Sequence, residues 1–369
     1  MRWQKGFFVG ILVLVLTMLW GVAGADSWTD EENYDISWYN SSDTEFLINS
    51  ASQLAGLAKI VNGGNDNFQG KTISLASDID LSQFSWTPIG NYDNSFQGVF
   101  DGCGHEVKNI SISSYAKDSR GQIYSGFFTW LSGATIQNLT LQGNIICGDT
   151  VHFAGGFCAE AENVVFENCT SNMTFGDSTI YYAAGFAAVS GDISFINCTN
   201  NSNINLQTSS GVGGYIGFAV EGKVVISECT NTGNISSSYH TAGGFIAKST
   251  ADSIDLSSSM NSGNVTLIYT YGSQSGGFIG HNKSGEVEIE FCVNTGKITG
   301  ADAGGIIARN TEESDSFASI TIENCKNQGD IAVNEALDMF SPNIGGGIIG
   351  WCLNAQVNHC INYGNVTAS

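Results

Sequence analysis

A short block of two small residues followed by an aromatic or aliphatic residue recurs along most of this 369-residue chain. The steps between successive copies are 30, 29, 29, 30, 33, 28 and 42 residues, and the longest step contains an insertion around residues 335–342. Self-similarity at such a period is typical of repeat architectures, in which each copy stacks on the next. The copies are Ser125-Gly126-Phe127, Gly155-Gly156-Phe157, Ala184-Gly185-Phe186, Gly213-Gly214-Tyr215, Gly243-Gly244-Phe245, Gly276-Gly277-Phe278, Gly304-Gly305-Ile306 and Gly346-Gly347-Ile348.

A second block follows each glycine block and defines four aligned positions. One position holds cysteine, with Ser259 replacing it once: Cys169, Cys198, Cys229, Cys292, Cys325 and Cys360. Two residues later most copies have asparagine: Asn200, Asn231, Asn261, Asn294, Asn327 and Asn362. Four residues after the cysteine comes glycine in Gly233, Gly263, Gly296, Gly329 and Gly364. Six residues after it comes isoleucine or valine.

This register predicts an all-β chain coiled into a parallel β-helix, with three short strands in each coil of about 30 residues. One copy cannot bury its own apolar face, whereas stacked copies align like residues in columns. We expect the cysteines to form an interior column of small apolar groups and the asparagines a ladder of side-chain amides. We expect the glycines to lie where the chain turns with positive φ.

Disulfides between neighbouring cysteines of the column are the alternative, because adjacent strands lie ~4.8 Å apart. Ser259 interrupts the column, and packing requires no oxidation, so we predict buried free thiols. Cys147 and Cys158 lie off the column and could form a pair.

The N-terminus has the pattern of a secretory signal peptide. Arg2 and Lys5 precede an apolar run, and Ala23-Gly24-Ala25 supplies the small residues of a cleavage site. We therefore divide the chain into a signal peptide (1–25), a lead segment (26–43), a capping helix with the first coils (44–124) and the repeats (125–369). The predicted product is secreted or bound to the cell surface, with no membrane span after cleavage. The alternative is an uncleaved anchor.

The residues before the repeats predict a short helix. Ser50-Ala51-Ser52-Gln53 has the spacing of a capping box, apolar residues follow at helical periodicity, and Asn62-Gly63-Gly64 ends the pattern. We expect this helix to cover the open end of the first coil. Residues 71–75 and 78–81 are predicted strands. At the other end, the chain finishes inside the repeat register, so we expect an uncovered last coil, typical of a fragment or a dimerising end.

Two resemblances arise from these segments. The stretch from Phe96 to Ile112 resembles the opening coils of right-handed β-helix proteins of the pectin-lyase-like class. The run from Phe46 to Ile112, together with Gly-Gly-Phe-Ile-Gly at 276–280 and Gly-Gly-Ile-Ile-Gly at 346–350, is similar to bacterial GLUG-motif surface proteins. This similarity covers residues 44–369. It implies a right-handed parallel β-helix and an extracellular, adhesin-like protein that binds glycans or host and matrix surfaces, and it implies no catalytic residues.

The composition excludes several function classes. The formal net charge is −22 and becomes −24 if the signal peptide is removed, so the chain is not expected to bind nucleic acid, which requires clustered cations. The five histidines show no metal-ligand spacing, and no phosphate-binding glycine motif occurs. We predict no metal and no cofactor.

A polysaccharide lyase or hydrolase is the alternative function. Only Arg120 and Arg309 remain after signal cleavage, and the chain has no adjacent pair of aspartates. The strongest carboxylate candidates are Asp78, Asp80 and Asp101, and such residues more often satisfy turns and backbone groups. We therefore predict a protein without catalytic activity.

Aromatic residues before the glycine blocks are the candidate ligand-binding residues. Tyr124, Tyr182, Tyr239 and Tyr271 would form a loose stripe along one edge if they are exposed, together with Phe153 and Phe340. Such a stripe would suit stacking on sugar rings. The alternative is that loops fold these rings against the coil, since their offsets from the glycines vary.

Overall fold

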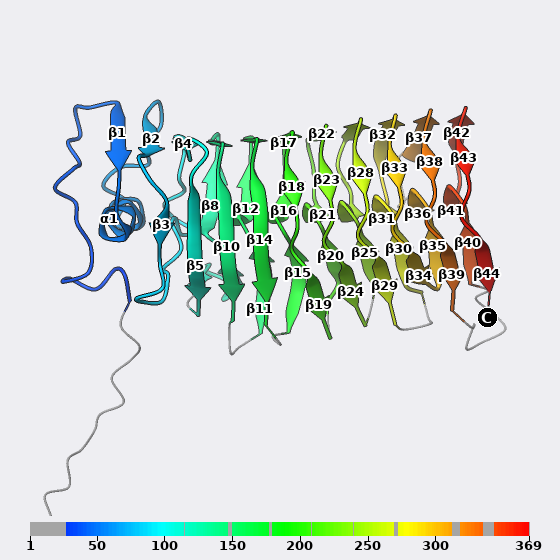
Figure 1. Cartoon of the computed structure of the whole chain (residues 1–369), viewed down its shortest axis with the longest axis horizontal. Helices are drawn as coiled ribbons and strands as arrows, with labels where there is room; N and C mark the ends of the chain where they lie inside the picture. Colours follow the sequence, from blue (N-terminus) through cyan, green and yellow to red (C-terminus); the bar gives the residue numbers. More distant parts are fainter. Residues whose placement is uncertain are drawn as a thin grey trace, which may run out of the picture.

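The fold was determined from a computed structural model. It describes residues 27–113, 115–146, 150–176, 179–207, 209–238, 240–268, 272–311, 318–334 and 343–368. The predicted signal peptide, Tyr239, Tyr271, Cys147 and the insertion at 335–342 lie outside these residues. The chain forms one elongated stack of parallel coils with a helix at its N-terminal end (Figure 1), which confirms the all-β solenoid.

The described residues form five sheets that run along the stack. The 11-stranded sheet contains β1 (Glu45–Ile48), β2 (Thr72–Leu75), β4 (Val99–Asp101), β9 (Thr135–Gln137), β13 (Val164–Glu167), β17 (Ile193–Ile196), β22 (Lys223–Ser227), β27 (Ser253–Ser257), β32 (Gly285–Glu290), β37 (Ala318–Glu323) and β42 (Ala355–Asn358). The 10-stranded sheet contains β3 (Ile79–Asp80), β5 (Glu106–Ile112), β10 (Thr140–Ile145), β14 (Thr170–Phe175), β18 (Thr199–Asn200), β23 (Thr230–Asn231), β28 (Met260–Asn261), β33 (Val293–Asn294), β38 (Lys326–Asn327) and β43 (Ile361–Asn362).

Two further sheets meet at the glycine block. The nine-stranded sheet contains β6 (Ala116–Lys117), β7 (Ile123–Ser125), β11 (Val151–Gly155), β15 (Ile180–Ala184), β20 (Gly211–Gly213), β25 (Thr241–Gly243), β30 (Gln274–Gly276), β35 (Asp302–Gly304) and β40 (Ile344–Gly346). The eight-stranded sheet contains β8 (Phe128–Ser132), β12 (Cys158–Glu162), β16 (Ala187–Ser190), β21 (Ile216–Ala219), β26 (Ile246–Ser249), β31 (Ile279–Asn282), β36 (Ile307–Asn310) and β41 (Ile349–Cys352). The six-stranded sheet contains β19 (Ile204–Leu206), β24 (Ile235–Ser237), β29 (Val265–Leu267), β34 (Ile298–Gly300), β39 (Ile331–Val333) and β44 (Val366–Ala368).

A complete coil therefore contains five short strands, not the three predicted. The coil from β20 to β24 shows the reason. The chain bends at Gly214-Tyr215, between β20 and β21, and again between Asn231 at the end of β23 and Ile235 at the start of β24. Apolar residues on both sides of each bend point into the same core, so the sequence pattern does not reveal the bends.

Residues other than the repeat glycines adopt the positive φ angles. The residue before each cysteine position adopts φ between 50° and 56°: Asn168, Asn197, Glu228, Ser258, Phe291, Asn324 and His359. The glycines of the repeat columns have a different role. A Cβ added to Gly263 would lie 1.9 Å from the carbonyl oxygen of Gly233, the equivalent residue one coil earlier. These glycines are required because successive coils approach closely. The prediction that they lie at turns with positive φ was wrong.

Side chains stack in columns inside the coil. The rings of Phe157, Phe186, Tyr215, Phe245 and Phe278 follow one another at 4.6–4.9 Å between centroids. The cysteines of the repeat register are free thiols, buried from Cys169 to Cys325 and partly buried at Cys360. Cys158 is also a buried free thiol.

The asparagines of the repeat register form a ladder of side-chain hydrogen bonds. The Nδ2 of each residue from Asn200 to Asn327 donates to the Oδ1 of the next one along the stack, at 2.7 Å each time. From Asn231 onward the same Nδ2 also donates to the carbonyl oxygen two residues ahead. The ladder thus satisfies buried polar groups at the bend.

The helix α1 (Ala51–Asn62) begins as the sequence predicts. The Ser50 hydroxyl accepts a hydrogen bond from the Gln53 N–H at 3.3 Å, while the Gln53 side chain accepts one from the N–H of Asn49 at 3.0 Å. Leu54, Leu57 and Val61 are fully buried. Figure 1 shows α1 beside β1 at the N-terminal end of the stack, where it covers the core of the first coils.

Candidate binding surface

The turn at the glycine block brings two sheets together at a sharp corner. A Cβ on Gly213 would lie 2.0 Å from the carbonyl oxygen of Ile216, and one on Gly214 would lie 2.1 Å from the carbonyl oxygen of Gly244. A Cβ would therefore overlap the backbone of the same coil at Gly213 and that of the next coil at Gly214. As a result, partly exposed side chains of β21 and its equivalents face those of the nine-stranded sheet.

The eight-stranded sheet contributes one residue from every coil to this corner. In each coil it lies five residues after the first residue of the glycine block. Strand pairing aligns Trp130, Glu160, Val189, Phe218, Lys248, His281, Arg309 and Trp351 in one column. This column was not predicted from the sequence, although its constant offset from the glycine block is a signal that could have marked it.

The nine-stranded sheet contributes the facing column. Pairing aligns Tyr124, Phe153, Tyr182, Gly211, Thr241, Gln274, Asp302 and Ile344. We call these two columns together the corner surface.

The predicted aromatic stripe is only partly realised. Tyr124 is just 2% exposed, so the expectation of an exposed ring is wrong there, because Trp130 and Phe153 cover it. Tyr182 is partly exposed and lies in register with Phe153. Burial raises the pKa of Tyr124 to about 12, helped by the nearby charges of Glu160 and Asp118, and burial also raises the pKa of Tyr182.

Aromatic rings fill the N-terminal half of the corner surface. The ring of Tyr124 lies 4.3 Å from that of Trp130 and 4.9 Å from that of Phe153. Phe153 stacks on Tyr182 at 6.1 Å and 9° between planes, and Tyr182 stacks on Phe218 at 5.1 Å. Phe153, Tyr182 and Phe218 are partly exposed, so they form a continuous aromatic platform across three coils.

Basic side chains occupy three successive coils beyond this platform. The Lys248 ammonium lies 4.7 Å from the ring centre of Phe218, and the Arg309 guanidinium lies 5.2 Å from that of Trp351. His281 lies between them in the column. We call Lys248, His281 and Arg309 the basic segment.

One carboxylate faces the basic segment from the other column. The Nε of Arg309 lies 3.2 Å from the Oδ2 of Asp302, but this buried Nε forms no hydrogen bond. Burial raises the pKa of the Asp302 carboxyl group. The charge of Arg309 and a hydrogen bond from the Ile344 N–H act in the opposite direction and reduce this shift. The pair is therefore a close ionic contact without hydrogen-bond alignment.

Glu160 is the only acidic member of the eight-stranded column. Burial raises the pKa of its carboxyl group, and the hydrogen bond from Trp130 and the charge of Arg120 oppose this shift. The charge of Asp118 raises it further. Asp118 itself has a fully buried carboxylate that accepts hydrogen bonds from the Arg120 N–H and Nε and from the Gln122 N–H, at 2.8–3.0 Å.

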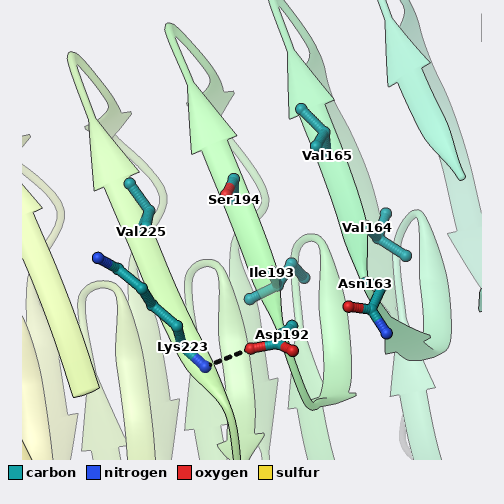
Figure 2. A pocket seen from close by; sticks show the side chains of 8 residues that line it. All are labelled: Asn163, Val164, Val165, Asp192, Ile193, Ser194, Lys223 and Val225. Atoms are coloured by element: carbon teal, nitrogen blue, oxygen red, sulfur yellow. Dashed lines mark hydrogen bonds between the residues drawn. The ribbon is translucent and has the colours of Figure 1, made fainter. Parts of the chain in front are cut away.

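A shallow depression of about 300 Å³ on the 11-stranded sheet is a second candidate (Figure 2). Val165, Ser194 and Val225 form its floor. Its charged groups are already paired, because Asp192 Oδ1 accepts the N–H of Lys223 at 2.6 Å and the Lys223 ammonium lies 2.5 Å from Asp255. The depression therefore offers no converging polar groups to a ligand.

The carboxylate candidates Asp78, Asp80 and Asp101 bond to the chain itself. Asp78 accepts the N–H of Glu106, Asp80 accepts that of Ser82, and Asp101 accepts that of Cys103, at 2.7–3.2 Å. Burial disfavours ionisation of Asp101. Hydrogen bonds from Asn138, Cys103 and Gln137 outweigh this effect of burial, so the pKa of Asp101 is lowered. These residues satisfy turns, as expected for the structural alternative.

The described ranges contain no cluster of three or more His, Cys, Asp or Glu side chains arranged to hold a metal ion. Within the same ranges, no helix has the length and apolar character to cross a membrane.

Comparison with known proteins assigns no family. No protein-family model matches the chain, and no curated protein matches it, so the GLUG resemblance stays a prediction. Among solved structures, the chain is similar to one described as a "putative immunoglobulin A1 protease from Bacteroides ovatus". The two are 16% identical with a TM-score of 0.41, over 88% of this chain and 79% of that chain. A match at this level carries no argument about function, so the fold assignment rests on the chain's own sheet pairing.

Proposed function

We propose that this chain is a secreted or cell-surface repeat protein that binds an extended glycan along the corner surface without cleaving it. The observation that carries this proposal is the platform of Phe153, Tyr182 and Phe218, whose partly exposed rings stack on one another across successive coils. Aromatic faces suit the apolar faces of sugar rings. The strands of successive coils are ~4.8 Å apart, so a platform running along the stack favours an extended ligand.

Binding without cleavage is supported by the state of the acidic groups. Hydrolysis of a glycoside generally requires two carboxyl groups that flank the scissile bond. Glu160 reaches the corner surface, but the carboxylate of its neighbour Asp118 is buried and accepts three hydrogen bonds. Because it is buried and bonded in this way, Asp118 does not provide the second solvent-accessible carboxyl group beside Glu160.

The test is a glycan array probed with the intact protein and with Tyr182→Ala and Phe218→Ala. We expect each variant to lose roughly fivefold to a hundredfold in affinity for the glycans that the unmodified protein binds, equivalent to about 1–3 kcal/mol per stacked ring. Phe291→Ala is the matched control, because Phe291 is 58% exposed on another part of the coil. Unchanged binding by both corner variants, or equal loss in the control, would refute the proposed surface.

A carbohydrate-active enzyme is the second candidate, and the raised pKa of the Glu160 carboxyl group favours it. A raised carboxyl pKa is usual for the general acid of such enzymes. The bound glycans are therefore incubated with the protein and assayed for new reducing or unsaturated ends. Release that disappears in Glu160→Gln would replace the binding proposal with an enzymatic one.

A further inference from the structure

We infer that two copies of this chain associate through the coil that runs from β40 to β44. This inference goes beyond the proposed glycan binding and does not depend on it. Each of the five sheets in the described ranges has one of β40, β41, β42, β43 and β44 as an outermost strand. Figure 1 shows these strands at the opposite end of the stack from α1. The coil therefore presents five strand edges together, and exposed edges of this kind readily pair with another chain.

The core is open at this end of the stack. Val357 is 46% exposed, whereas its partner Ile322 in the preceding coil is fully buried. Val366 is 45% exposed, whereas its partner Ile331 is fully buried. Positions that belong to the core in the preceding coil thus face solvent in this one. A partner that covers them removes this apolar surface from water.

The same coil lacks the charged residues that the rest of the chain carries. Residues 344–368 contain no Asp, Glu, Lys or Arg, whereas residues 302–333, which form the preceding coil, contain eight. Strand pairing aligns Asn358 with Glu323 and Ile361 with Lys326, so uncharged residues stand where the preceding coil has charged ones. Charged side chains normally protect an exposed edge from pairing, and this coil has no such protection.

A second copy of this chain is the partner that an uncharged coil fits. In a two-fold symmetric contact, each residue near the axis meets its own copy, so a charge there would repel itself. A coil without charged residues avoids this repulsion. It also allows two chains, each with a formal net charge of −22, to approach where they carry the least charge.

The other end of the stack does not offer a matching surface. There α1 covers the core and buries Leu54, Leu57 and Val61 completely. The contact is therefore between two identical ends, and an association of this kind closes as a dimer instead of extending into a filament.

The symmetry also determines how the edge strands meet. A two-fold axis normal to one face of the stack reverses the direction of the edge strand on that face, so this strand meets its copy antiparallel. Antiparallel strands exchange backbone hydrogen bonds across such an edge. The dimer is an end-to-end rod with an α1 helix at each far end.

The full chain is tested by sedimentation equilibrium and small-angle X-ray scattering. We expect a dimer whose maximum dimension is about twice that of a single chain. The dimer should persist as the salt concentration rises, because salt screens the repulsion between two acidic chains. A chain that stays monomeric throughout the micromolar range would overturn the inference, and so would a dimer no longer than one chain, which indicates side-by-side association.

Asn358→Glu and Ile361→Lys are the test variants. Each introduces the residue that the preceding coil has at the aligned position, Glu323 or Lys326, so the coil is expected to accept it. Because the two substitutions add opposite charges, a change in net charge does not explain a loss of association in both. We expect each variant to raise the dissociation constant of the dimer at least about tenfold, with an unchanged circular dichroism spectrum.

Ser257→Glu is the matched control. Strand pairing places Ser257 in the same column as Glu290, Glu323 and Asn358, three coils away from the contact, so this variant should remain dimeric. Unweakened association of either test variant, or an equal loss in the control, would overturn the inference. The substituted residues lie outside the corner surface, so the glycan array remains a separate test of the proposed function.

Discussion

At the residue scale, small differences in side-chain volume decide whether coils can stack. The glycine two residues after each ladder asparagine lies against the backbone of the equivalent residue one coil earlier, which is Ser202 for Gly233 and a glycine in the later coils. An ideal Cβ would lie 1.9–2.0 Å from the carbonyl oxygen of that residue at Gly233, Gly263, Gly296, Gly329 and Gly364. Real Cβ atoms do not approach a carbonyl oxygen this closely. The column therefore limits the spacing of the coils.

Gly263→Ala should destabilise the protein by about 3 kcal/mol or more, because the new methyl group overlaps the backbone of Gly233 and neither coil can move without breaking sheet pairing. Urea unfolding followed by circular dichroism measures the change. Gly176→Ala is the control, since its Cβ would meet its nearest atoms at an ordinary 3.5 Å, and it should change stability by less than about 0.5 kcal/mol. Equal effects of the two substitutions would contradict the steric explanation.

A second residue-scale prediction concerns Glu160. Burial raises the pKa of its carboxyl group in the folded state, so the stability that its neutral form provides is complete below the unfolded pKa of about 4.3 and is lost as the pH rises through the folded pKa. Glu160→Gln mimics the neutral form. The variant should match the unmodified protein near pH 4 and be more stable at pH 7, as measured by urea unfolding across this range. A stability difference that does not change with pH would show that Glu160 does not titrate in this way.

At the scale of elements, α1 and the first strands close one end of the stack. The helix buries Leu54, Leu57 and Val61 completely, and β1 is the outermost strand of the 11-stranded sheet. Short strands of two to seven residues are stable here because each pairs with neighbours in adjacent coils. An element at the end has fewer neighbours and depends more on its own packing.

Leu57→Ala in α1 should cost about 2–5 kcal/mol, the range for a fully buried leucine. It should also raise the hydrogen-exchange rates of β1 and β2 more than those of central strands, since coils interact only with their neighbours. Lys59→Ala is the control on the exposed face of the same helix, and we expect it to cost less than about 1 kcal/mol. Uniform acceleration of exchange along the stack would argue for one cooperative unit in place of local closure by the helix.

At the scale of the whole molecule, one core runs through all coils and holds thiols that solvent does not reach. Burial is the main cause of the raised pKa of Cys158, Cys198 and Cys229. A thiol reacts as its thiolate, so a buried thiol with a raised pKa is unreactive. Cys103, in contrast, is exposed.

Alkylation of the native protein with iodoacetamide, followed by peptide mass spectrometry, should therefore modify Cys103 well before Cys169, Cys198, Cys229, Cys292 and Cys325. The protein unfolded in urea serves as the control, and there all of these cysteines should react at similar rates. Rapid modification of the column in the native protein would contradict a closed core, and failure to react in urea without a reductant would indicate disulfides.

The repeat period, the helix at 51–62 and the cysteine and asparagine columns followed from sequence alone, because stacking equivalent residues imposes the same chemistry at every period. Only the tertiary structure determined the five-strand division of the coil, the close approach at Gly263 and the corner surface. Lys248, His281 and Arg309 differ in chemistry and vary from copy to copy, so no repeated residue type marks their column. Their proximity results from strand pairing between coils and from the turn at the glycine block, which brings together side chains that the linear sequence separates by about thirty residues.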